Sequence, residues 1–254
     1  MEQAATTRRG YFNSARIAVI AMFSSLAGIL YIFNFSMSFA FPSFLEFNFS
    51  DIPTLIGTFT LGPVSGVIIT VIKILLKLVF KGTSTVFVGE LSDLVTSCVF
   101  AVTAGLIYKR KRTFKGALIA MAAGTAAEVA VAIIFNWLVL VPFYVQFFFH
   151  GSWEPLIGMM TPLFPNCTKE NFYNFYLWVS ILPFNLMRCL VAVLVTLPVY
   201  KRISNLINKF NAKITPKDDA SGEKVRKINI GAIIAGVAIL ALLVLFALLR
   251  FFVF

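Results

Sequence analysis

The sequence is short of charged residues and of the side chains that usually hold metal ions. Only 13% of its 254 residues are charged, whereas a soluble domain carries about a quarter. It has a single histidine, His150, and three cysteines, Cys98, Cys167 and Cys189, without the spacing of a metal site. We therefore expect neither a metal site nor a disulfide framework.

Motifs for hydrolysis and nucleotide binding are also missing. The sequence contains no G-x-S-x-G, H-E-x-x-H or G-x-x-x-x-G-K-S/T segment. A chain without a phosphate-binding loop is not expected to hydrolyse ATP, so any ATP-driven step would need partner subunits. We expect no catalytic residue and no cofactor.

Apolar residues are abundant instead, at 59% of the chain. They form runs long enough to cross a bilayer as helices, and polar segments separate the runs. This pattern predicts an all-α membrane protein that spans the cell membrane several times. The runs cover residues 15–35, 52–80, 86–108, 117–145, 172–199 and 228–254.

The second run is expected to break at Gly62-Pro63, because proline removes a backbone donor and disfavours helix at the preceding residue. Ser50 and Asp51 precede Pro53 and are expected to cap the start of this run. The segment before it, 36–49, is aromatic and nearly uncharged, and we expect a loop that packs on the protein, for example as a lid.

Basic residues predict the orientation in the membrane. Positive loops stay cytoplasmic, and the break at Gly62 places every basic cluster on one side of the membrane. The Phe41 region and the segments 81–85 and 146–171 fall on the other side. The side that carries the basic clusters is predicted to be cytoplasmic and to hold the N-terminus. The net charge of +11 then reflects membrane orientation, and nucleic-acid binding is not expected. The clusters are Arg8, Arg9 and Arg16, then residues 109–115, and residues 201–227.

Ionisable groups within the runs are candidates for function, because burying charge in a membrane is costly. Lys73, Lys77, Glu90 and Asp93 fit internal charge pairing or snorkelling to the membrane surface. An alternative is an intramembrane enzyme that uses Glu90 and Asp93.

Asn136, Asn185 and Arg188 have two readings. They fit hydrogen bonds between helices that fix the bundle. They also fit recognition of a planar heterocycle, with Trp137 and Phe184 as apolar walls.

A stripe of small residues follows the first run at helical spacing. Such a stripe permits close helix approach, and it suits internal packing and an external partner equally well. Its members are Ser14, Ala18, Ala21, Ser25 and Gly28.

Several segments resemble the riboflavin-specific S components of energy-coupling factor (ECF) transporters. They are P-S-F-L-E-F-N-F-S-D-I-P at 42–53, L-G-P at 61–63, P-F-Y at 142–144 and L-P-F-N-L-M-R at 182–188. The resemblance covers about residues 8–209 and implies a six-helix bundle that binds a vitamin at its outer end.

The resemblance also implies roles for particular residues. Asn136 and Asn185 match positions expected to bond the flavin ring, and Arg188 stands where the family often has lysine. Leu45, Glu46 and Phe47 match the lid that contacts the ligand. The implied partners are a transmembrane coupling protein and two cytoplasmic ATPases, which would dock on Ser14, Ala18, Ala21 and Ser25.

Two features depart from the family. The outer segment 146–171 is longer, and the last run, 228–254, has no counterpart in a six-helix S component. We expect a six-helix domain at 1–210, a basic cytoplasmic linker at 211–227 and an additional transmembrane helix at 228–254. An S component for another vitamin is the alternative to riboflavin.

Overall fold

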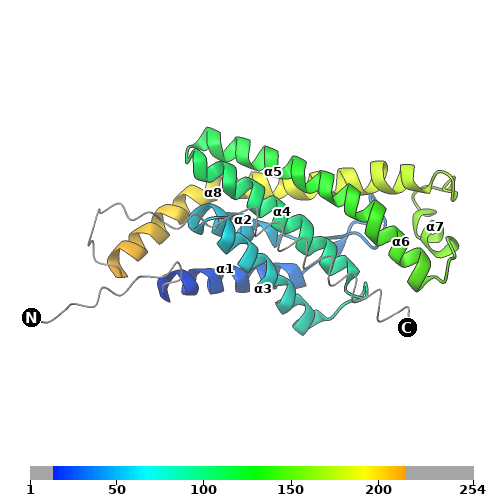
Figure 1. Ribbon diagram of the computed structural model, residues 1–254, viewed down its shortest axis with the longest axis horizontal. Coiled ribbons are helices and arrows are strands. Elements are labelled where there is room, and N and C mark those ends of the chain that lie inside the picture. Colours follow the sequence, from blue (N-terminus) through cyan, green and yellow to red (C-terminus); the bar gives the residue numbers. More distant parts are fainter. Residues whose placement is uncertain (1–13, 215–254) are drawn as a thin grey trace, which may run out of the picture.

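A computed structural model describes residues 14–214. They form an elongated bundle whose helices run roughly along one axis (Figure 1). Arg8, Arg9, the predicted helix 228–254 and most of the predicted linker lie outside the described residues. The linker's first four residues belong to the last described helix, which ends at Ile214.

The first three helices confirm the predicted break. Helix α1 (Ser14–Ile32) is followed by α2 (Asp51–Leu61) and α3 (Pro63–Lys81). Gly62 between them has a φ of 99°, a conformation that favours glycine, and Pro63 occupies the first turn of α3, where its missing donor is tolerated.

Helix α4 (Val88–Arg110) is followed by α5 (Phe114–Phe135), which Thr113 caps by accepting a 3.0 Å hydrogen bond from the Gly116 amide. The α5 helix continues without interruption through η1 (Asn136–Leu140), α6 (Val141–Phe143) and η2 (Tyr144–Phe148). The two π-helical stretches, η1 and η2, flank Pro142. Proline cannot donate the regular helical bond, so the wider π turn accommodates it.

Beyond a short α7 (Glu154–Met160), η3 (Asn174–Ile181) runs into α8 (Leu182–Ile214). Five of these continuous helical stretches in residues 14–214 are long and apolar enough to cross a membrane. The shorter α2 lies among them and buries nine of its residues. The predicted all-α membrane class is confirmed. Apart from the short α7, the six helical stretches of residues 14–214 match the expected six-helix bundle.

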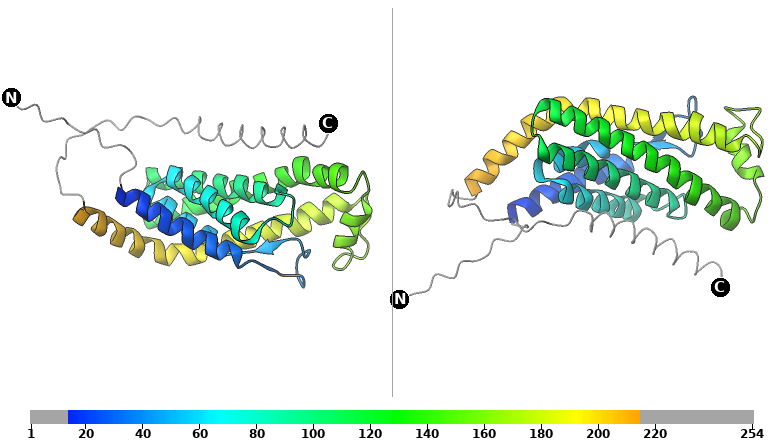
Figure 2. Two further views of the ribbon diagram at one scale, coloured as in Figure 1. Left: turned by 90° about the horizontal axis from the view of Figure 1, so that it is seen from below. Right: turned by 45° about the horizontal axis from the view of Figure 1, so that its top comes forward.

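The predicted loop at 36–49 is partly a β-ribbon. Strands β1 (Phe35–Ser36) and β2 (Glu46–Phe47) pair antiparallel, with Phe35 opposite Phe47. The aromatic rings of this segment stabilise the pairing, since the Phe35 and Phe47 centroids lie 5.5 Å apart and those of Phe47 and Phe49 lie 5.1 Å apart. Figure 2 places this ribbon and α7 at the same end of the bundle.

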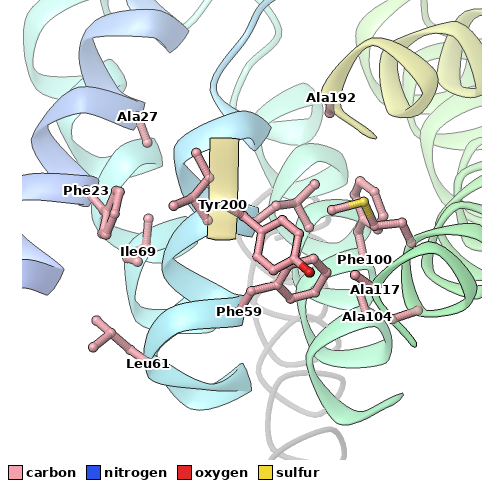
Figure 3. Packing of buried hydrophobic residues seen from close by; sticks show 14 of the residues in the cluster. Phe23, Ala27, Phe59, Leu61, Ile69, Phe100, Ala104, Ala117, Ala192 and Tyr200 are labelled. Carbon is pink, nitrogen blue, oxygen red and sulfur yellow. The ribbon is translucent and has the colours of Figure 1, made fainter. Parts of the chain in front are cut away.

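The opposite half of the bundle holds a large apolar core. Phe23 from α1, Phe59 from α2, Phe100 from α4 and Tyr200 from α8 all belong to it (Figure 3). Because lipid is itself apolar, this core stabilises the bundle mainly by close packing. The predicted basic clusters gather at this end, with Arg16 on α1, residues 109–115 at the α4–α5 turn and residues 201–213 on α8, while the ribbon and α7 lie at the other.

Candidate ligand pocket and the ionic network behind it

A cavity of about 370 Å³ lies at the ribbon end of the bundle, within the size range of small-molecule sites. Residues from α1, the ribbon segment, α3, α4, the α5 continuation, α7, η3 and α8 form its wall. Asn136, Asn185 and Arg188 all line it, so the structure brings together these three predicted residues from distant segments.

Asn136 begins η1 and is held by two hydrogen bonds. Its Nδ2 atom donates to the Ala132 carbonyl at 2.8 Å, and its Oδ1 atom accepts from the Tyr176 hydroxyl at 2.7 Å. An amide offers two N–H donors and two acceptor lone pairs. One donor and one acceptor of Asn136 are therefore left for a ligand.

Asn185 is arranged in a similar way on α8. Its Nδ2 atom donates to the Ile181 carbonyl at 2.8 Å, and its Oδ1 atom accepts no hydrogen bond within residues 14–214. The neighbouring Phe184 lines the cavity and contacts Phe41 of the ribbon segment, with ring centroids 5.3 Å apart. The cavity thus presents two amides beside an aromatic wall.

Arg188 is surrounded by carboxylates. Its Nη1 atom donates to Asp93 at 2.7 Å, its Nη2 atom donates to Glu128, and its Nε atom lies 3.6 Å from Asp51. Thr96 accepts a further bond at 3.3 Å. Buried ions are tolerated only when they are paired in this way. The guanidinium therefore binds other side chains of the protein and also forms part of the cavity wall.

Three more charged side chains complete the interior. Lys73 donates to Asp51 at 2.7 Å and to Ser50 at 2.9 Å, and Lys77 pairs with Glu90. Internal pairing is therefore what the structure shows for the four predicted ions. The predicted capping role of Ser50 and Asp51 is wrong, because neither side chain bonds the first turn of α2 and both bind Lys73.

The carboxylates of Glu90 and Asp93 are occupied by these contacts. Glu90 is paired with Lys77, and Asp93 accepts bonds from Arg188 and from the Tyr31 hydroxyl. Within residues 14–214 no cluster of three or more metal-ligating side chains occurs. The arrangement favours binding over acid-base catalysis.

Two of the three predicted lid residues line the cavity and the third does not. Leu45 and Glu46 line the cavity, together with Phe44, whose ring lies 5.9 Å from that of Tyr176. Phe47 does not line it but is buried in a small cluster with Phe41 and Phe184. It supports the wall from behind.

One of the two predicted wall residues does not line the cavity, and two residues that do line it were not predicted. Trp137 is 52% exposed on the outside of the bundle and does not line the cavity, whereas Phe184 does. Leu156 and Met159 of α7 contribute to the wall although no motif marks them. The spacing of these two, one turn apart in a helix, was the only available signal.

One member of the small-residue stripe on α1 is buried and the other four are exposed. Gly28 is buried, and a Cβ atom placed there would lie 2.7 Å from Leu76 of α3, so this position serves internal packing. The other four positions are exposed and form an outer face of the bundle, at Ser14, Ala18, Ala21 and Ser25.

Comparison with known proteins gives a consistent result. The family described as "ECF transporter, substrate-specific component" matches residues 15–200. The riboflavin transporter RibU of Staphylococcus aureus is 30% identical over 78% of this chain and 94% of its own length. The riboflavin transporter FmnP of Bacillus subtilis is 29% identical over 52% of this chain and 70% of its own length.

A solved structure, described as the S component of a bacterial ECF transporter, has the same fold. It is 30% identical, it superposes with a TM-score of 0.58, and the match covers 76% of this chain and 96% of that one. The family match and the structural superposition therefore point to the same family. This chain belongs to the substrate-specific components of ECF transporters.

Proposed function

We propose that this chain captures riboflavin at the outer face of the cell membrane for an ECF importer. The two pocket amides carry this proposal. Asn136 and Asn185 line one cavity, and each has a donor and an acceptor that residues 14–214 leave unbonded. The pyrimidine edge of a flavin alternates carbonyl acceptors with an N–H donor, which such amides complement.

The remaining wall suits a flat ring system. Phe44, Tyr144, Phe148 and Phe184 line the cavity, and aromatic side chains stack on or abut planar ligands. Relatives named as riboflavin transporters support the same ligand.

The ribbon segment would serve as the lid. Leu45 and Glu46 already reach the wall from this segment, and Asn34 donates a hydrogen bond to Glu46 across its base. A ligand that contacts both the ribbon and the helices would favour the closed arrangement over an open one.

Energy would come from partner subunits, because the sequence has no phosphate-binding loop. We assign the partners as a transmembrane coupling protein and two cytoplasmic ATPases. The exposed residues Ser14, Ala18, Ala21 and Ser25 form the docking face, since small side chains permit close helix contact. The basic end of the bundle would face the cytoplasm, together with the N-terminus.

The test is to identify the bound molecule. Purified full-length protein should release riboflavin on acid extraction, and the ligand-free protein should quench flavin fluorescence on titration. Replacing Asn185→Leu should weaken binding by at least about tenfold through lost hydrogen bonds. Asn205→Leu, at an exposed site farther along α8, is the control and should bind normally.

A different outcome would point to another vitamin. If no flavin is extracted and riboflavin does not bind, while another vitamin raises the melting temperature, the riboflavin assignment is wrong and the family assignment stands.

A further inference from the structure

We propose that the ribbon and the adjoining outer ends of α1 and α3 form one membrane-contact surface, which lies in the headgroup region of the outer leaflet. The partner of this surface is the phospholipid layer itself. The inference goes beyond the proposed function, because it concerns what covers the outside of the ribbon and needs no ligand in the cavity. It uses only the orientation proposed above, with the basic end of the bundle toward the cytoplasm.

The outer ends of α1 and α3 lie next to each other and expose large apolar side chains. Phe33, which follows α1, is 71% exposed, and Val79 and Phe80 of α3 are 78% and 73% exposed. Lys81 joins the two ends, because its Nζ atom donates to the Ile32 carbonyl at 3.4 Å. An apolar surface of this kind marks contact with a membrane or with another protein.

The ribbon continues this surface beyond the helix ends. Phe35 of β1 is exposed, and Phe39 in the turn of the ribbon is 85% exposed. Glu46 is the only charged residue of the ribbon segment. Asn34 donates a hydrogen bond to Glu46 and accepts one from Lys81, so the carboxylate is linked to an ammonium. Exposed aromatic rings beside a few polar groups suit the boundary between lipid and water.

The lengths of α1 and α3 place this surface at the membrane boundary. Each helix has 19 residues, which span about 28 Å, close to the roughly 30 Å of the hydrocarbon core. Both helices begin at the basic end, where Arg16 of α1 donates to the Leu61 carbonyl just before α3. Their other ends therefore reach the outer headgroup region when the basic end lies at the cytoplasmic surface.

The α5 side of the bundle is longer. The continuous stretch Phe114–Phe148 has 35 residues and spans about 50 Å. It extends past the ends of α1 and α3 toward α7 (Figure 1). On the α5 side the cavity wall therefore stands above the membrane in water, whereas on the α1–α3 side the ribbon meets the lipid surface.

A lipid surface explains these side chains better than the coupling protein does. The proposed docking residues of α1 end at Ser25, about two helical turns before Phe33. They are small, as closely packed partner helices require, whereas the outer surface is aromatic, as is typical of the membrane boundary. Lys81 is exposed beside this surface, and a lysine stem lies along apolar surface while its ammonium reaches polar headgroups.

The test places a fluorophore in the turn of the ribbon. Full-length Ala40→Cys protein is labelled with a nitrobenzoxadiazole maleimide and placed in phosphatidylcholine nanodiscs. Ala40 is exposed and does not line the cavity. The unmodified protein gives the background, because its three cysteines are buried. Phosphatidylcholine with a nitroxide on the headgroup should quench the label at least about twofold, because the turn lies among headgroups, and iodide in the water should quench it weakly.

Ser152→Cys is the matched control, because Ser152 is exposed in the turn before α7, on the side of the bundle that stands above the membrane. Its label should respond to iodide and not to the nitroxide lipid. Adding Phe39→Ser to the Ala40→Cys protein should reduce the quenching by lipid, since the turn loses an exposed aromatic ring. If the labels at Ala40 and Ser152 respond alike to both quenchers, the ribbon lies in water and the proposal is wrong. Equal quenching by lipid with and without Phe39→Ser would overturn the part assigned to Phe39.

Discussion

The Arg188 guanidinium and the Asp93 carboxylate are joined by a 2.7 Å hydrogen bond between residues 95 positions apart in the chain. The contact links α8 to α4 at the wall of the cavity. Arg188 also donates to Glu128 on α5, and its Nε atom lies close to the Asp51 carboxylate on α2. One side chain therefore ties four helices together beside the ligand site.

Replacing Arg188→Met should destabilise the protein by about 3–5 kcal/mol, because it leaves buried carboxylates without their partner. Arg188→Lys should cost less, since it keeps the charge but loses the forked geometry. Thermal unfolding in detergent measures both. Arg202→Met, at an exposed position of the same helix, is the control and should unfold like the unmodified protein. Equal melting temperatures for all variants would contradict the network's role.

Replacing Tyr176→Phe should weaken ligand binding by about five- to tenfold, through loss of one hydrogen bond of about 1 kcal/mol. The Tyr176 hydroxyl orients Asn136 by donating to its Oδ1 atom. Without it, the amide would have to be ordered when the ligand binds. Tyr173→Phe is the control, because Tyr173 does not line the cavity. Fluorescence titration compares the two, and equal losses would contradict an orienting role.

The sequence predicts those features of this molecule that local chemistry determines. The break between α2 and α3 follows from Gly62 and Pro63, and the membrane-spanning stretches follow from apolar run length. The roles assigned to Asn136 and Asn185 came from the family resemblance, because two asparagines in separate helices fit simple helix packing equally well.

Other features depend on contacts that a single sequence does not encode locally. The sequence around Asp51 fits a helix cap, and only the three-dimensional packing of α2, α3 and α8 makes Asp51 the partner of Lys73 and Arg188. The π turns on both sides of Pro142 have the same apolar composition as the α-helix before them, so the sequence does not distinguish them from it. The part of the cavity wall that α7 forms likewise depends on how the segment between η2 and η3 folds back over the bundle.

Replacing Met159→Ala should weaken ligand binding by about fivefold and leave stability nearly unchanged. Met159 lines the cavity but is 42% exposed, so its loss removes ligand contacts and creates little internal void. Leu156→Ala should also cost about 2–5 kcal/mol of stability, since Leu156 is buried. Glu154→Ala, exposed on the same short helix, should change neither property. Unchanged affinity for Met159→Ala would show that α7 does not meet the ligand.

Replacing Ala21→Trp should abolish uptake while leaving riboflavin binding intact. Ala21 lies on the exposed face of α1 and does not line the cavity, so a bulky ring there blocks close approach of a partner helix without reaching the ligand. Leu190→Trp, at an exposed position of α8, is the matched control and should transport normally. Uptake by whole cells and titration of purified protein separate the two activities. Normal uptake by the Ala21→Trp variant would place the docking face elsewhere on the bundle.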